Sequence, residues 1–169
     1  ENDFLRVGVR AGRASDILDC RYKPMDVDFM LRLKKGILNP NEIFSQQRGT
    51  DNQFEDYYYG GWQEILPNSP AFNYRGAALG QHGEVSLIPW KHAILENTPQ
   101  KVVVKLWTRP LRVPILIEKT LTLFHDKASL FIAEKPSNES ATPLDIPWGQ
   151  HIAFGLPFLN DGARVNTKA

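Results

Sequence analysis

Two histidines, each lying beside glycines in a strand-rich sequence, are the residues best suited to chemistry. His82 lies in the segment GQHGE (residues 80–84), and His151 lies in the segment WGQHIAFG (residues 148–155). Histidine gives and takes protons near neutral pH because its ordinary pKa is about 6.5. Gly80 and Gly83 permit tight turns and a close approach of the backbone to a ligand. The pattern predicts a proton-transfer site whose two histidines are carried on loops between strands.

The other two histidines are weaker candidates. His125 stands beside Asp126 and Lys127 in a hairpin-turn sequence between two strand-like runs, so we expect it to be exposed. His92 follows Trp90 closely and is a candidate for lining a site.

Other catalytic chemistries lack their usual motifs. The sequence has no H-x-x-x-H or C-x-x-C pair for a metal, no G-x-S-x-G nucleophile elbow and no Walker loop, so we expect neither a metal nor another cofactor. Paired carboxylates for glycoside hydrolysis stay open, because Glu55, Asp56, Glu64 and Glu84 lie in or near one loop-like region.

Aromatic residues gather in that same region and favour a sugar ligand. Aromatic faces stack on the C–H faces of sugar rings, whereas the alternative is that these rings fill a core on the loop side. We take Trp62 and Trp90 as candidate stacking residues, Arg75 as a candidate for binding a hydroxyl or phosphate group, and Glu84 as a further substrate contact. The aromatic residues that carry this prediction are Tyr57, Tyr58, Tyr59, Trp62, Phe72, Tyr74 and Trp90.

Composition excludes several partners. The 169 residues carry a net charge of +1 and are 42% hydrophobic, which is close to the average for a globular domain and gives no basic field for nucleic acid. The longest apolar runs are far shorter than the roughly 18–20 residues that span a bilayer, so we expect no membrane contact. A single cysteine, Cys20, fits a reducing compartment, and we expect a cytoplasmic location.

Strand patterns dominate the elements that must position these residues. Ile115 to Leu123 alternates apolar and polar side chains, and runs rich in β-branched or aromatic residues cover 101–108 and 129–134. Residues 4–9 and 17–22 are two further expected strands, whereas 27–35 fits a short helix as well as a strand. Residues 39–80 match no pattern, so we expect a long functional loop. The sequence predicts one all-β domain, an antiparallel sandwich.

Three stretches resemble the aldose 1-epimerases, the galactose mutarotase-like family. They are YGGWQEILPN (59–68), QHGE running to Pro89-Trp90 (81–90), and WGQH running to Pro157-Phe158-Leu159 (148–159). The resemblance covers nearly the whole chain, and its two histidine motifs are the specific part. It implies the large antiparallel β-supersandwich of that family, present here in part, with residues 1–169 as a portion of one such domain.

The resemblance also implies an activity, the interconversion of the α and β anomers of a hexose or related sugar. By position, His151 resembles the acid that protonates the ring oxygen, and His82 resembles the histidine that binds and orients that oxygen. The family's base is a glutamate from the C-terminal part of the domain, which we expect to lie beyond Ala169. Two alternatives stay open: a non-catalytic carbohydrate-binding module, and a lyase, hydrolase or sugar isomerase on the same fold.

Overall fold

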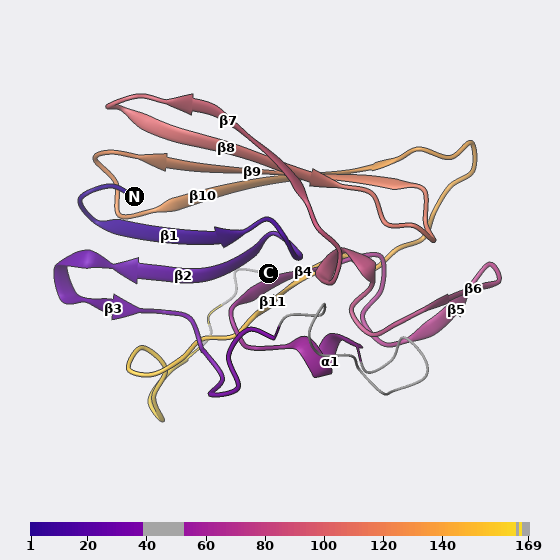
Figure 1. The fold of residues 1–169 in the computed structure, drawn as a ribbon, viewed down its shortest axis with the longest axis horizontal. Helices are drawn as coiled ribbons and strands as arrows, with labels where there is room; N and C mark the ends of the chain where they lie inside the picture. The colour runs from indigo at the N-terminus through magenta and orange to yellow at the C-terminus, as the bar shows by residue number, and fades with distance from the viewer. Residues whose placement is uncertain (39–52, 165, 167–169) are drawn as a thin grey trace.

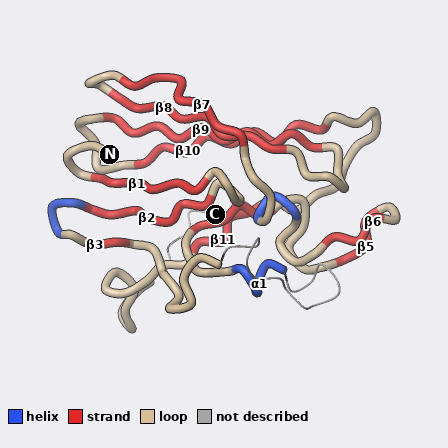
Figure 2. The backbone as a smooth tube through the Cα atoms, viewed as in Figure 1, coloured by secondary structure: helices blue, strands red, loops and turns tan. Residues whose placement is uncertain are grey.

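The chain folds as an antiparallel β-sandwich, which confirms the predicted all-β class (Figure 1). The structure is a computed structural model, and it describes residues 1–38, 53–164 and 166. Within these residues strands form a five-stranded sheet, a four-stranded sheet and a two-stranded hairpin. Short helical turns and loops connect the strands (Figure 2).

The five-stranded sheet has the order β1-β2-β4-β11, and β3 pairs with the end of β2 at Arg21 and Tyr22. All of its pairings are antiparallel. Its central strand β4 is joined to β2 at one pair, Ile17 with Trp62, and to β11 along four pairs. The strand bounds are β1 Leu5–Arg10, β2 Asp16–Tyr22, β3 Val27–Asp28, β4 Trp62–Ile65 and β11 Gly149–Ile152.

The four-stranded sheet is a meander in the order β10-β9-β8-β7. Its strands are β7 Lys91–Asn97, β8 Lys101–Thr108, β9 Ile115–Phe124 and β10 Leu130–Asn138. The predicted strands at 101–108, 115–123 and 129–134 are therefore confirmed, and the last one continues through Pro136. Proline is tolerated there because β10 is an edge strand, where the missing N–H removes no ladder hydrogen bond on the open side.

The remaining elements are short. Strands β5 (Phe72–Tyr74) and β6 (Ala77–Leu79) form a projecting hairpin, and the helix α1 covers Gln53–Tyr57. Two 3-10 turns, η1 and η2, cover Lys23–Met25 and Glu84–Ser86. In Figure 1 the hairpin extends away from the sandwich, whereas α1 lies beside β4 and β11.

The apolar core lies between the four-stranded sheet and the segment that runs from β4 to η2. Residues Leu66, Leu79, Val85, Trp90, Leu106, Val113, Ile115, Ile117 and Leu121 make up this buried cluster. The odd-numbered positions of β9 face it, as the alternation in the sequence predicts. The core therefore fixes the loop after β6 against the four-stranded sheet.

The prediction of a long patternless loop over 39–80 is wrong for its described part. Residues 53–80 contain α1, β4, β5 and β6, and β4 is the centre of a sheet. Residues 39–52 lie outside the described part of the chain. The ambiguous segment 27–35 is strand-like: β3 is followed by isolated bridges from Met30 to Phe154 and from Arg32 to Gly60.

Candidate functional site

The backbone around His82 is fixed by close packing on Leu66, the residue that follows β4. His82 itself has a φ of +61°, and its N–H donates to the Ser69 carbonyl at 2.7 Å. Gly83 follows with a φ of +73°, and a Cβ there would lie 2.0 Å from the Leu66 carbonyl oxygen. Glycine is required at 83 both for the backbone conformation and for the contact. His82 thus lies in a turn, as predicted, and the turn is held in one position.

His151 lies in strand β11 and not in a loop, so that part of the prediction is wrong. It pairs with Gln63 of β4 in the antiparallel register. Its neighbour Gln150 donates to both oxygens of the Glu134 carboxylate on the other sheet, at 3.1 and 2.9 Å. Successive side chains of a strand point to opposite faces, so His151 faces the outer side of the five-stranded sheet.

The two histidines meet on that outer face. Their ring centroids are 5.1 Å apart, with an angle of 49° between the ring planes. Phe54 of α1 packs edge-on against both rings, with centroid distances of 4.5 Å to His82 and 5.3 Å to His151. Tyr58 packs against His151 at 5.2 Å. Two short segments far apart in the sequence therefore form one imidazole pair with an aromatic wall.

The surroundings of His82 lower its pKa below that of an isolated histidine and so favour its neutral form. Burial lowers its pKa, and the nearby charge of His151 lowers it further, whereas the carboxylate of Glu55 acts in the opposite direction. The Nδ1 atoms of both rings are buried without a hydrogen-bond partner. The side-chain Nε2 of Gln81 lies 3.5 Å from Nε2 of His82. The lowered pKa means that the His82 imidazole is neutral near pH 7, and a neutral imidazole offers one nitrogen as a hydrogen-bond acceptor.

Trp62 and Trp90 lie away from the imidazole pair. Trp62 donates through Nε1 to the Gln150 side chain at 2.6 Å, which places it on the inner face of the sheet. Trp90 is 3% exposed, and its Nε1 donates to the Val85 carbonyl at 3.0 Å. Neither indole shares a face with His151, and Trp90 fills the core, the alternative we gave for the aromatic residues.

Glu84 and Arg75 are engaged with other parts of the chain. The Glu84 carboxylate accepts from the Arg112 backbone N–H at 2.9 Å and from the Arg112 guanidinium at 2.6 Å. Arg75, in the turn between β5 and β6, donates to Thr142 Oγ1 at 3.1 Å and to the Pro143 carbonyl at 2.8 Å. Both side chains hold loops in place, and within the described residues their hydrogen bonds go to partners other than the histidines.

A buried ionic network behind His151 did not emerge from the sequence. Lys119 of β9 is 1% exposed; its Nζ lies 2.8 Å from a Glu64 oxygen and 3.2 Å from a Glu134 oxygen. Trp148 donates through Nε1 to Glu64. Burial and the neighbouring Glu64 carboxylate raise the pKa of Glu134 to about 7. The signal was a charged residue in the otherwise apolar row of β9, where only a paired charge is tolerated.

A second buried carboxylate lies at the start of β2. Asp16 is fully buried and accepts a hydrogen bond from the Tyr59 hydroxyl. Burial raises the pKa of Asp16 to about 7, although the nearby Arg13 and Arg10 favour its charged form. Its other carboxylate oxygen has no partner. The Tyr57–Tyr59 segment is therefore held from two sides, by Tyr58 at the histidines and by Tyr59 at Asp16.

No group of three or more His, Cys, Asp or Glu side chains among the described residues is arranged to hold a metal ion. The described helices are also too short to cross a membrane. Comparison of the chain with family models, with curated proteins and with solved structures gives no match in any of the three. The resemblance to aldose 1-epimerases stays a prediction from motifs.

Proposed function

We propose that the chain carries the histidine part of an acid/base site that opens and closes the ring of an aldose. The observation that supports this most is the meeting of His82 and His151, 5.1 Å apart between ring centroids and half-buried beside Phe54 and Tyr58. An aromatic wall suits the C–H face of a sugar, and the imidazoles suit its hydroxyl and ring oxygens. The substrate class is a hexose or a related sugar.

The chemistry requires opposite proton movements at two oxygens. An acid protonates the ring oxygen while a base removes the proton of the anomeric hydroxyl; after rotation about the C1–C2 bond, the roles reverse and the ring closes. We assign the acid to His151 and the binding of the ring oxygen to His82. Glu55 is a described carboxylate whose charge acts on His82, so its replacement by Gln tests whether it assists the base step.

Equilibration of freshly dissolved α-anomers, followed by polarimetry or NMR for a panel of aldoses, tests the proposal. We expect equilibration faster than in buffer, and a loss of about 100-fold or more in the catalysed rate for His151→Asn. His125→Asn is the matched control, because His125 is exposed in the turn between β9 and β10. Equilibration no faster than in buffer for every aldose would overturn the enzyme proposal.

A sugar-binding module without turnover is the second candidate. It is favoured by the unpartnered Nδ1 atoms of both histidines, because a catalytic imidazole is usually oriented by a group bound to its second nitrogen. Calorimetry separates the two candidates. Sugar binding that survives His151→Asn, together with no acceleration of anomer exchange, would establish the module; binding that disappears with the catalysed rate would establish the enzyme.

A further inference from the structure

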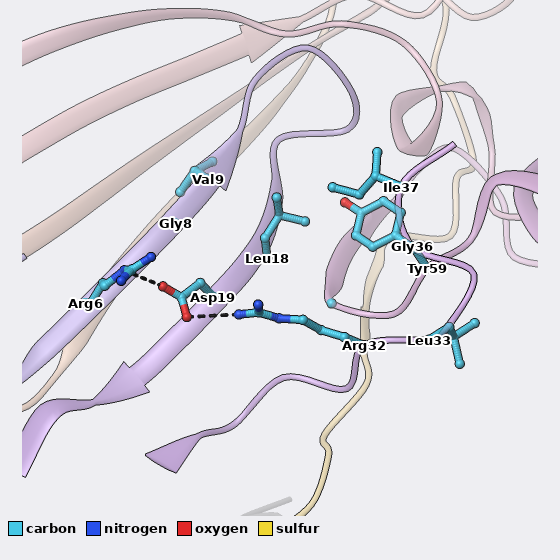
Figure 3. Close-up of a pocket in the computed structure, with 11 residues that line it drawn as sticks. Arg6, Gly8, Val9, Leu18, Asp19, Arg32, Leu33, Gly36, Ile37 and Tyr59 are labelled. Atoms are coloured by element: carbon cyan, nitrogen blue, oxygen red, sulfur yellow. Dashed lines mark hydrogen bonds and ion pairs between the residues drawn. The ribbon is translucent and has the colours of Figure 1, made fainter. Parts of the chain in front are cut away.

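A second concave site lies on the outer face of β1 and β2 (Figure 3). Its cavity measures about 540 Å³, within the range of roughly 300–1,000 Å³ that small-molecule sites occupy. Apolar walls come from Leu33, Ile37 and the ring of Tyr59, and charged groups come from Arg6, Asp19 and Arg32. None of these residues belongs to the imidazole pair, so the cavity is a separate candidate site.

The charged groups are arranged around one carboxylate. Asp19 is 7% exposed; one of its oxygens lies 2.8 Å from Arg6 Nε and the other lies 3.0 Å from Arg32 Nη2. Arg21 approaches the same carboxylate at 3.9 Å. Figure 3 shows Arg6 and Arg32 reaching Asp19 from opposite sides. Gly8 leaves room for the Asp19 side chain, because a Cβ there would lie 3.1 Å from the Asp19 Cβ.

The charged groups at the cavity differ in how many partners they have. Among the described residues that line it, Arg6 and Arg32 are the cations and Asp19 is the anion, and Asp28 behind the cavity balances part of the charge of Arg32. Arg6 is the more available of the two, since its side chain is 61% exposed and its ion pair is with Asp19, whereas Arg32 is held by Asp28 as well as by Asp19. Each guanidinium carries five N–H donors, so Arg6 keeps donors for a second acceptor.

We propose that this cavity binds a small organic anion, a carboxylate or sulfonate with an apolar ring body. The anionic group binds Arg6 beside the fixed Asp19–Arg32 pair, and the ring body lies against Tyr59, Leu33 and Ile37. Planar guanidinium groups bind such anions through paired hydrogen bonds, and a partly enclosed site strengthens them. The site does not depend on the proposed sugar chemistry, because no histidine lines it.

The test uses two fluorescent probes on the whole chain. Anilinonaphthalenesulfonate has the ring body and the anion, whereas phenylnaphthylamine has a similar ring body without charge. We expect saturable binding of the sulfonate, weakened about tenfold by Arg6→Gln, with binding of the neutral probe changed less than about twofold. Arg109→Gln is the control, since Arg109 is similarly exposed and paired with Glu139 on another part of the surface.

Charge at the rim gives a second, independent readout. Ile37 is 51% exposed, so Ile37→Lys and Ile37→Glu should both fold, and they differ in the sign of the charge they add. At low salt we expect the sulfonate to bind at least about tenfold more tightly to Ile37→Lys than to Ile37→Glu. Equal binding to both, or binding of the sulfonate unaffected by Arg6→Gln, would overturn the proposal. His151→Asn should leave probe binding unchanged, which separates this site from the imidazole pair.

Discussion

Replacement of Lys119 by Met tests the buried network that supports strand β11. The ammonium lies 2.8 Å from Glu64 and 3.2 Å from Glu134, and it is 1% exposed. At an effective dielectric constant of about 20, a pair of unit charges 2.8 Å apart attracts by about 6 kcal/mol. Part of this is lost to desolvation of the ammonium, and removal of one partner from a buried ion pair typically costs about 3–5 kcal/mol.

Urea unfolding followed by tryptophan fluorescence measures this cost. With a slope of about 2 kcal/mol per molar urea, a loss of 4 kcal/mol lowers the midpoint by about 2 M. The loss should be larger at pH 8 than at pH 5. In the Lys119→Met variant no ammonium favours the charged forms of Glu64 and Glu134, so burial should raise the folded-state pKa of both carboxyl groups above the unfolded value. The variant should then lose stability as pH rises and these groups ionise.

Two further variants test whether the loss of stability comes from carboxylates that are left buried without a partner. Lys105→Met removes a lysine that pairs with Glu118 on the more exposed side of the same sheet, and we expect it to cost less than about 1 kcal/mol. Adding Glu64→Gln and Glu134→Gln to Lys119→Met should recover more than half of the loss, because no charge is then buried without a partner. A cost below about 1 kcal/mol for Lys119→Met alone would refute the reasoning.

Three other substitutions have defined outcomes. Gly83→Ala should lower the free energy of unfolding by about 3 kcal/mol and disturb His82, because the new Cβ would meet the Leu66 carbonyl. Gly76→Ala is the control in the same urea assay: its φ is also positive, +86°, but the space around it is open, so we expect a loss of about 1 kcal/mol. As pH falls from 7 to 5, the wild type should lose more stability than His82→Asn, since the folded-state pKa of His82 lies below its unfolded value; equal losses would contradict this. Asp16 has a folded-state pKa of about 7, so it contributes a loss of at most about 4 kcal/mol as pH rises from 4 to 7, and Asp16→Asn should abolish that contribution in unfolding measured across this range.

The strands that alternate clearly could be predicted from the sequence. Residues Ile115 to Leu123 alternate in the sequence, and their odd positions are the buried ones in β9. The same row contains Lys119, which was passed over because a lysine in an apolar row looks like an ordinary interruption. Its burial depends on Glu134, its cross-strand partner on the next strand β10, and on Glu64 of β4, which lies on the other sheet and far away in the sequence. No local pattern reports the second partner.

Strand β4 was missed for a related reason. Its four residues, Trp62 to Ile65, include Gln63 and Glu64, which are both fully or nearly fully buried. The segment matches no strand pattern, because two polar residues occupy its middle and polar residues are usually exposed. Hydrogen bonds and ion pairs compensate for this burial: Gln63 donates to the Gly60 carbonyl at 2.6 Å, and Glu64 binds Lys119. A short polar strand at the centre of a sheet has no signature in its own residues.

The two histidines of the candidate site could be predicted from the sequence, but the residues that position them could not. Both histidines are positioned by β4, the strand that the sequence did not predict. His151 is positioned by its register with Gln63 of β4, and the turn that carries His82 is packed on Leu66, the residue that follows β4. One short segment therefore positions both imidazoles, although they lie in separate motifs. Substitutions that shift β4 should therefore move the two rings together. The predicted stacking residue Trp62 points from β4 to the opposite face of the sheet, where it binds Gln150, which in turn binds Glu134 of the buried ionic network.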